Sequence, residues 1–150
     1  MRHPVALPRM VTIDDAAEIA DGLPGVTGQL WHGNRSWMVG RTAFAWERPF
    51  TKADIRRFGA STPPDGPIFA VRVEDLGEKE AVLASQTKGV FTIPHFDGYP
   101  AVLIQLKAVA KRALRDLIVD AWLACAPPAL ATAWIREQPR RVQRARAERT

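Results

Sequence analysis

The chain has little cysteine, little histidine and no long apolar run. Its 150 residues include a single cysteine, Cys125, which excludes an internal disulfide and a cysteine-based zinc cluster. The three histidines, His3, His32 and His95, lie far apart and lack the paired spacing of metal ligands. No stretch approaches the roughly 18 consecutive apolar residues that a membrane span requires. We therefore expect no metal site, no cofactor, no membrane partner and a cytoplasmic location.

The N-terminus makes a poor signal peptide because prolines interrupt its short apolar stretch, MRHPVALPRM. We expect residues 1–11 to form a flexible leader. The rest of the composition is typical of a globular protein, with 47% hydrophobic and 25% charged residues. Five tryptophans and six phenylalanines supply bulky side chains for a core. The length suits one domain, which we place at residues 12–135.

Positive charge is concentrated near the C-terminus. The formal net charge is +5. Residues 136–150 contain six arginines and two glutamates, whereas residues 1–135 contain fifteen basic and fourteen acidic residues. The domain is therefore almost neutral, and residues 136–150 form an arginine-rich tail of the kind that binds polyanions.

Capping and turn signals predict the first elements. Thr12, with Asp15 three residues later, predicts a helix over 13–21. The aromatic and β-branched residues that follow alternate with polar ones between Gly-Asn and Gly-Arg turns, which predicts a meander of hairpins. Thr51 predicts the cap of a short helix over 52–58. Further on we expect a strand at 68–73.

The second half of the chain predicts two helices and two strands. A helical segment follows Asp75, with Leu76, Val82 and Leu83 facing inward. Strands are expected in GVFTI and AVLIQL. The clearest helix spans residues 107–126. Its apolar stripe consists of Ala110, Ala113, Leu114, Leu117, Ile118, Ala121, Trp122 and Cys125. Together the elements predict an α+β fold, a two-layer antiparallel β-sheet with helices packed on one face.

Four stretches, taken in order, carry a resemblance to a known family. They are GLPGVTGQLWHGNRSWMVGRTAFAWERP, IFAVRVEDLGEKEAVLASQ, FTIPHFDGYPAVLIQL and LIVDAWLACAP. Together they resemble the MmcQ/YjbR family of small bacterial proteins over nearly the whole of residues 12–135. The resemblance implies a fold similar to secretion chaperones and frataxin-like proteins. It also implies a DNA-binding role, with no catalytic motif to carry over.

The stretch VFTIPHFDGYP, residues 90–100, predicts a turn rather than a catalytic loop. Asp97-Gly98 is a strong turn signal between two hydrophobic strands, and the Asp97 carboxylate is suited to accept N–H groups of the turn. His95 and Asp97 would share a face in an extended segment, but no nucleophile or partner motif accompanies them. We therefore predict no catalytic residue and no enzymatic activity. The alternative is a small-ligand pocket formed by Trp31, His95, Asp97 and Tyr99.

The nucleic-acid hypothesis depends on basic residues. Lys107, Lys111 and Arg115 recur every four residues along the predicted long helix, and Arg112 lies beside them. The alternative is a solvated helix face on which Asp116 pairs with Arg112. In the tail, the candidates are Arg140, Arg141 and Arg144.

Three functions remain open from the sequence. The first is non-enzymatic, sequence-independent binding of DNA through these basic residues. The second is a protein-interaction module, including self-association into a homo-oligomer through a sheet face or edge. The third is the small-ligand binder with a pocket near His95.

Overall fold

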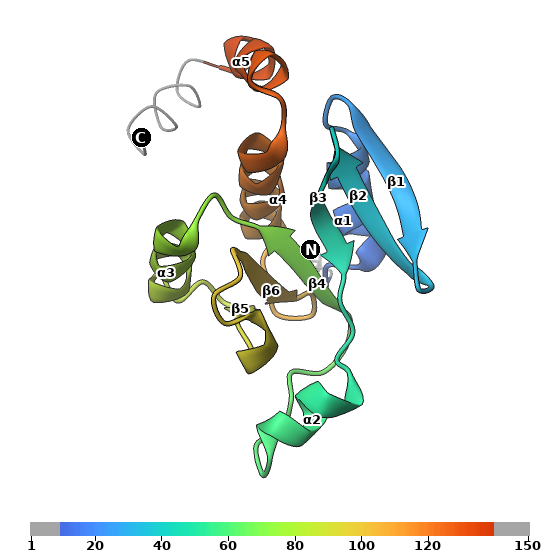
Figure 1. Cartoon of the computed structure of the whole chain (residues 1–150), viewed down its shortest axis with the longest axis vertical. Helices are drawn as coiled ribbons and strands as arrows, with labels where there is room; N and C mark the ends of the chain where they lie inside the picture. The colour runs from blue at the N-terminus through green and yellow to red at the C-terminus, as the bar shows by residue number, and fades with distance from the viewer. Residues whose placement is uncertain (1–9, 140–150) are drawn as a thin grey trace, which may run out of the picture.

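Six antiparallel strands form one sheet in the computed structural model, which describes residues 10–139 (Figure 1). The strands are β1 (Val26–Trp31), β2 (Asn34–Val39), β3 (Thr42–Glu47), β4 (Ile68–Arg72), β5 (Val90–Phe91) and β6 (Ala101–Gln105). Their order across the sheet is β1-β2-β3-β4-β6-β5, so β1 and β5 are the edge strands. The first three strands form consecutive hairpins, as the sequence predicts.

Helices complete the α+β fold. They are α1 (Ile13–Asp21), α2 (Lys52–Phe58), α3 (Leu76–Ala84), α4 (Lys111–Cys125) and α5 (Pro128–Arg136), with a short 3-10 helix η1 (Pro94–Phe96) before β6. The predicted fold class, an antiparallel sheet layered with helices, is confirmed. Among residues 10–139, no helix is both long enough and apolar enough to cross a membrane.

Local hydrogen bonds explain where α1 and α2 begin. The Thr12 hydroxyl accepts a hydrogen bond from the Asp15 N–H at 3.1 Å, and the Asp15 carboxylate accepts one from the Thr12 N–H at 2.9 Å. Thr51 and Asp54 repeat this reciprocal arrangement at α2, with the same two distances. Both pairs satisfy N–H groups that a helix start otherwise leaves without partners.

The main core lies between the sheet and the pair α1 and α4. Its largest fully buried side chains include Trp37, Phe44, Phe69 and Trp122. A β-bulge helps to fill it. Trp37 pairs with Ala45 and the next residue of β2 pairs with Ala43, so Phe44 is the extra residue of β3. Phe44 and Ala45 are therefore both buried in the same cluster, although they are neighbours in the chain.

A smaller core covers part of the opposite sheet face. Residues of β4 and β6 alternate between the two clusters, which places the clusters on opposite sides of the sheet. The smaller cluster contains Ile68, Ala70, Ile93, Phe96, Ala101 and Leu103. Phe50, which lies just before α2, and Phe58, the last residue of α2, pack against this cluster. Helices α1 and α4 thus cover one face, and η1 and α2 cover part of the other.

Several element boundaries differ from the sequence prediction. Helix α4 begins at Lys111, because residues 106–109 form a turn and the exposed Ala110 is the N-cap. Lys107 is therefore not on the helix. In α3, Leu76 is 49% exposed rather than inward-facing, whereas Val82 and Leu83 do pack against the main core.

Two of the stretches that carry the family resemblance meet in the core. The indole N–H of Trp122, from DAW, donates to the Pro24 carbonyl, from LPG, at 3.0 Å. Trp122 is fully buried, and the Trp134 ring lies 5.7 Å from it, centroid to centroid. These stretches therefore have a structural role, in holding the end of α1 against α4.

Candidate functional site

The four residues of the predicted ligand pocket lie at two different edges of the sheet. Trp31 ends the edge strand β1 and is 70% exposed. His95, Asp97 and Tyr99 lie in the connection between β5 and β6, at the other end of the strand order. The structure does not bring Trp31 to the other three, so these residues form no common pocket.

Residues 90–100 form the predicted turn, but by different contacts. The backbone closes it, since the N–H groups of Phe96, Asp97 and Tyr99 donate to carbonyls three residues earlier. The expected role for the Asp97 carboxylate is not seen among these bonds. Instead Lys79 of α3, which is 7% exposed, donates from Nζ to the carbonyls of Phe96 at 2.5 Å and Tyr99 at 2.8 Å. Burial lowers the pKa of Lys79, and the nearby charge of Asp97 partly opposes this.

An aromatic cluster lies on the sheet face opposite α1 and α4. We define it as Trp46, Phe96 and Tyr99, whose neighbouring ring centroids are 5.7 to 6.5 Å apart. Tyr99 is 39% exposed. The Arg72 guanidinium lies 5.2 Å from the Tyr99 ring and donates to its hydroxyl at 3.1 Å. The Arg48 guanidinium lies 5.5 Å from the Phe96 ring, so two cations flank the cluster.

One of the hydrogen-bond donors of Arg72 has no partner within the described residues. Its Nε is buried and has no hydrogen-bond partner among residues 10–139. Arg72 forms no ion pair with a carboxylate in this range. Within the described residues, no carboxylate therefore neutralises the charge of Arg72.

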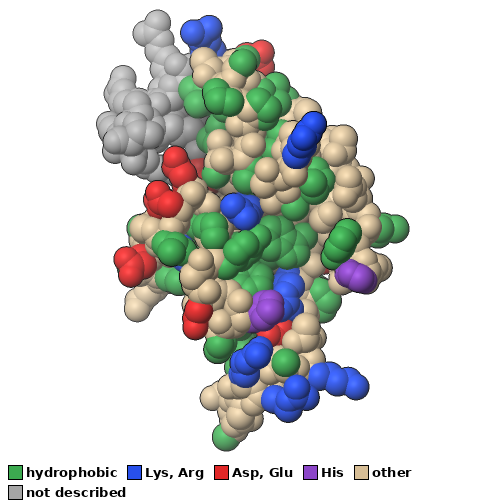
Figure 2. Space-filling model, in the orientation of Figure 1, with side chains coloured by type: hydrophobic (Ala, Val, Ile, Leu, Met, Phe, Trp, Pro, Cys, Tyr) green, Lys and Arg blue, Asp and Glu red, His purple; other side chains and the backbone are tan. Residues whose placement is uncertain are grey.

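A basic segment adjoins the aromatic cluster. Residues 48–58 carry four cations, Arg48, Lys52, Arg56 and Arg57, and one carboxylate, Asp54, which gives a formal charge of +3. Lys52, Arg56 and Arg57 are exposed. Figure 2 shows Lys and Arg side chains gathered over α2 at the bottom of the view, with hydrophobic side chains in the middle of the same face.

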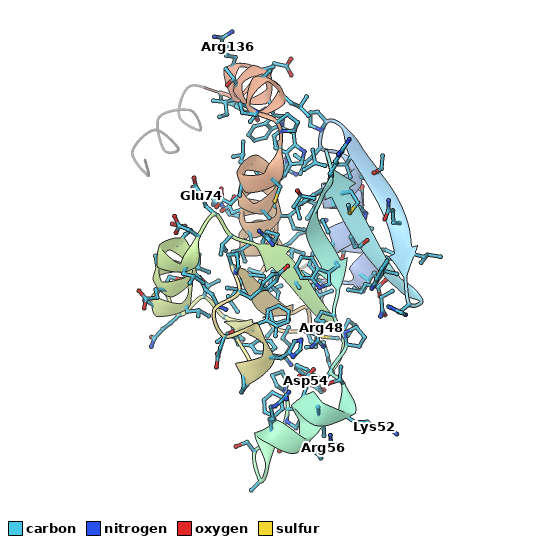
Figure 3. The ribbon with its side chains drawn as sticks, viewed as in Figure 1. Arg48, Lys52, Asp54, Arg56, Glu74 and Arg136 are labelled. Atoms are coloured by element: carbon cyan, nitrogen blue, oxygen red, sulfur yellow. The ribbon has the colours of Figure 1, made fainter. Side chains whose placement is uncertain are left out.

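Asp54 is the buried carboxylate within this basic segment and joins its residues to one another. It is 2% exposed, and its carboxylate lies 2.9 Å from Arg48 Nη1 and 3.7 Å from Arg57 Nη1. Figure 3 shows Arg48 and Asp54 where α2 meets the sheet. Burial by itself would raise the pKa of Asp54, but hydrogen bonds from Thr51 and Arg48 and the Arg48 charge outweigh it and lower the pKa below its usual 3.8.

An acidic segment lies on another side of the molecule. Residues 74–80 carry four carboxylates and one lysine, a formal charge of −3. Acidic side chains appear at the left of Figure 2, over α3. Residues 10–139 contain 14 basic and 15 acidic residues, so the described part is nearly neutral overall but its charges are separated.

Two of the four cations predicted on the long helix lie near carboxylates. Lys107 Nζ lies 2.8 Å from an Asp65 carboxylate oxygen, and Lys111 Nζ lies 4.0 Å from one of Asp15. Arg112 and Arg115 are exposed on α4. The proposed pairing of Arg112 with Asp116 is not seen among residues 10–139. The tail candidates Arg140, Arg141 and Arg144 lie outside the described residues.

The sequence predicts Tyr99 as a candidate, but not its grouping with Trp46 and Phe96, nor the buried Lys79. Arg72 ends an apolar strand, and no motif surrounds it. Residues of β4 alternate between the two faces of the sheet, and its last residue is the cation Arg72. A cation on a sheet face is the sequence signal that could have identified this residue. No comparable signal marked Lys79.

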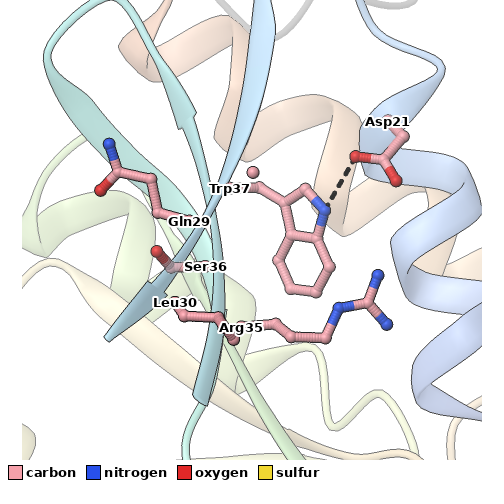
Figure 4. A pocket seen from close by; sticks show the side chains of 7 residues that line it. Asp21, Gln29, Leu30, Arg35, Ser36 and Trp37 are labelled. Atoms are coloured by element: carbon pink, nitrogen blue, oxygen red, sulfur yellow. Dashed lines mark hydrogen bonds between the residues drawn. The ribbon is translucent and has the colours of Figure 1, made fainter. Parts of the chain in front are cut away.

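An open depression of about 250 Å³ lies between β1, β2 and the end of α1 (Figure 4). Trp37 lines it and donates from its indole N–H to the Asp21 carboxylate at 3.0 Å. The Arg35 guanidinium lies 5.1 Å from the Trp37 ring. Within residues 10–139, no group of three or more His, Cys, Asp or Glu side chains is arranged to hold a metal ion.

The chain shares its fold with Deinococcus radiodurans protein DR2400, a DUF419 domain of known crystal structure, with a TM-score of 0.51 and 20% identity over 76% of this chain and 78% of that one. DUF419 is a YjbR/MmcQ-like family. No protein-family model matches the sequence.

Relatives in mycobacteria are much more similar. The chain is 47% identical over 129 residues to the uncharacterized proteins Rv2570 of Mycobacterium tuberculosis and Mb2600 of Mycobacterium bovis. The match covers 84% of this chain and 97% of each relative. The chain therefore belongs to the family of these mycobacterial proteins.

Proposed function

We propose that this protein is a non-enzymatic, cytoplasmic protein of MmcQ/YjbR type that binds nucleic acid independently of sequence. The observation that carries the proposal is the charge of the basic segment, +3 within eleven residues, beside an aromatic cluster flanked by Arg48 and Arg72. Cations that contact phosphates contribute affinity without reading bases.

The aromatic cluster favours single strands over duplex. Unpaired bases stack on exposed aromatic rings, whereas bases in a duplex are already stacked on one another. Tyr99 is the most exposed ring of the cluster, and Arg72 holds it through its hydroxyl. A single strand would thus place bases on Tyr99 and phosphates along Lys52 and Arg56.

The test is fluorescence anisotropy of the full chain with a labelled 20-nucleotide single strand and a duplex of equal length, from 25 to 300 mM salt (about the range over which phosphate contacts weaken). Reversing two charges in Lys52→Glu with Arg56→Glu should weaken binding by about tenfold or more at low salt. It should also reduce the salt slope by about 1.4 for the single strand.

Matched variants separate the contributions. Arg41→Glu with Lys88→Glu makes the same change of charge at exposed positions outside the basic segment and should have a much smaller effect. Tyr99→Ala should weaken single-strand binding by about 1–3 kcal/mol and leave duplex binding nearly unchanged.

A third variant tests the tail. Replacing Arg140, Arg141 and Arg144 by glutamine measures its share of the affinity in the intact chain. Binding that does not fall with salt, or no binding at the lowest salt, would reject the proposal. Equal losses in the two charge-reversal variants would reject the basic segment as the contact surface.

A further inference from the structure

The two edge strands of the sheet differ in how they are protected. β5 is only two residues long, which limits the number of backbone groups it leaves open. β1 is six residues long, VTGQLW, and contains no charged residue. Five of its six residues are exposed, and Leu30 and Trp31 are 73% and 70% exposed. A long, uncharged edge with exposed apolar residues is a template for another strand.

The hairpin fixes which backbone groups of β1 point outward. Its loop is His32-Gly33, and both residues have positive φ, 49° and 80°, which corresponds to a type I′ turn. In such a hairpin the flanking pair Trp31 and Asn34 exchanges both hydrogen bonds, and hydrogen-bonded pairs then alternate along the ladder. The N–H and C=O groups of Val26, Gly28 and Leu30 therefore point away from β2.

The outward strand is chemically symmetric about Gly28. Apolar Val26 and Leu30 lie two positions on either side of it, and polar Thr27 and Gln29 lie between. A two-fold axis at Gly28 places Gly28 opposite its own copy and Leu30 opposite Val26 of the second copy. This register uses all three outward residues as hydrogen-bonded pairs. Shifts of the register leave at least one of them without a partner.

From this self-complementarity we propose that β1 pairs antiparallel with β1 of a second copy of this chain, which joins the two six-stranded sheets into one. The absence of charge on β1 means that the two-fold axis brings no like charges together. Figure 1 shows β1 at the outer edge of the sheet, with no other described element beyond it.

The buried area indicates a weak, reversible dimer. Trp31 and Leu30 expose together about 300 Å² per copy, given the size of aromatic and aliphatic side chains. Two copies with their polar neighbours then bury on the order of 1,000 Å², near the lower limit for a specific interface. The depression beside β1 is lined by Gly28, Leu30 and Trp37 and lies next to the proposed contact. It adds to the surface that the second copy would contact.

Gly28 allows a test by complementary charges. A Cβ at this position meets no atom within 4 Å, so the folded monomer accommodates a side chain there. Gly28→Glu or Gly28→Lys alone would place like charges opposite each other at the axis. An equimolar mixture of the two variants would place glutamate opposite lysine.

The experiment is sedimentation velocity over a concentration series up to about 500 µM, a range that detects weak association. The wild type should gain mass with concentration, and each single variant should remain monomeric. The mixture should regain at least the wild-type association. Ser61→Glu and Ser61→Lys, on the exposed loop after α2, are the matched controls and should associate like the wild type.

Leu30→Lys is a second test variant. Leu30 is highly exposed, so its replacement should leave the fold intact. The variant should weaken association at least tenfold. A wild type that stays monomeric throughout the series overturns the proposal. So does a mixture that fails to regain association, or single variants that dimerise normally. These measurements contain no nucleic acid, so the pairing of β1 stands or falls separately from the proposed function.

Discussion

Asp54 is the residue whose replacement tests the electrostatics of the basic segment most directly. Its carboxylate accepts hydrogen bonds from the Thr51 N–H and from Arg48 Nη1, both at 2.9 Å, and lies 3.7 Å from Arg57. Asp54→Ala removes a helix cap and a buried partner of Arg48 at once. Asp54→Asn keeps an oxygen that accepts from Thr51 but removes the negative charge.

The two losses differ in size. A helix cap contributes about 1 kcal/mol. Removing one partner of a buried ion pair costs about 3–5 kcal/mol, but Arg48 keeps a hydrogen bond to the Pro49 carbonyl at 2.6 Å and its side chain is 15% exposed. We therefore expect Asp54→Ala to lower the free energy of unfolding by about 2–4 kcal/mol in total. Asp54→Asn should have an intermediate effect.

Urea denaturation followed by tryptophan fluorescence measures these differences. The matched control is Asp75→Ala, because Asp75 caps α3 by accepting from the Glu78 N–H at 2.8 Å and has no ion-pair partner among residues 10–139. The control should lose only the cap, about 1 kcal/mol. If Asp54→Ala costs no more than Asp75→Ala, the ion pair with Arg48 contributes nothing and the reasoning fails.

The pH dependence of the same variants gives an independent check. Because the folded pKa of Asp54 lies below the usual 3.8, its stabilisation is fully present above that value. It is lost as the pH falls through the folded pKa, where the folded chain also takes up the proton. The difference between wild type and Asp54→Ala should therefore shrink below about pH 4.

Three further predictions concern single contacts. Lys79→Met removes the Nζ donor and with it both hydrogen bonds to the turn carbonyls. It should speed amide exchange at Asp97 and Tyr99 and lower the free energy of unfolding by about 1–3 kcal/mol in urea denaturation. Burial lowers the pKa of Lys79 in the folded chain, so between that pKa and 10.5 the unfolded chain binds more protons than the folded chain. The free energy of unfolding of the wild type should therefore rise with pH in this window. Urea denaturation of Lys79→Met should not show this rise. Trp122→Phe leaves the Pro24 carbonyl without its donor and should cost about 1–2 kcal/mol in the same assay, whereas no loss would show that water replaces the indole.

Local features of the fold follow from the sequence because their partners are close in the chain. The cap at Thr12 joins residues three apart, and the capping residue Thr51 lies the same distance from Asp54. The meander of β1, β2 and β3 needs only two-residue turns. Such interactions form in a short peptide, so a pattern of neighbouring residues is sufficient to predict them.

The candidate site depends on contacts that the pattern does not encode. Tyr99 reaches Arg72 only because β6 pairs beside β4, and Lys79 reaches the turn across 17 and 20 residues. The predicted helix began four residues too early because the alanines before Lys111 continue its apolar spacing. In the structure Lys107 instead contacts Asp65, 42 residues earlier in the chain. Tertiary pairing therefore overrides helical periodicity at this point.

The two proposals together predict how binding depends on protein concentration. A dimer through β1 carries two basic segments, so a nucleic acid long enough to reach both is bound twice and gains affinity through effective concentration. A strand that fits one segment gains nothing. The mixture of Gly28→Glu and Gly28→Lys should bind a long strand about tenfold more tightly than either variant alone. It should bind a short strand with the average affinity of the two. A gain of equal size on both strands would mean that the charge at residue 28, and not pairing of the edge strands, alters binding.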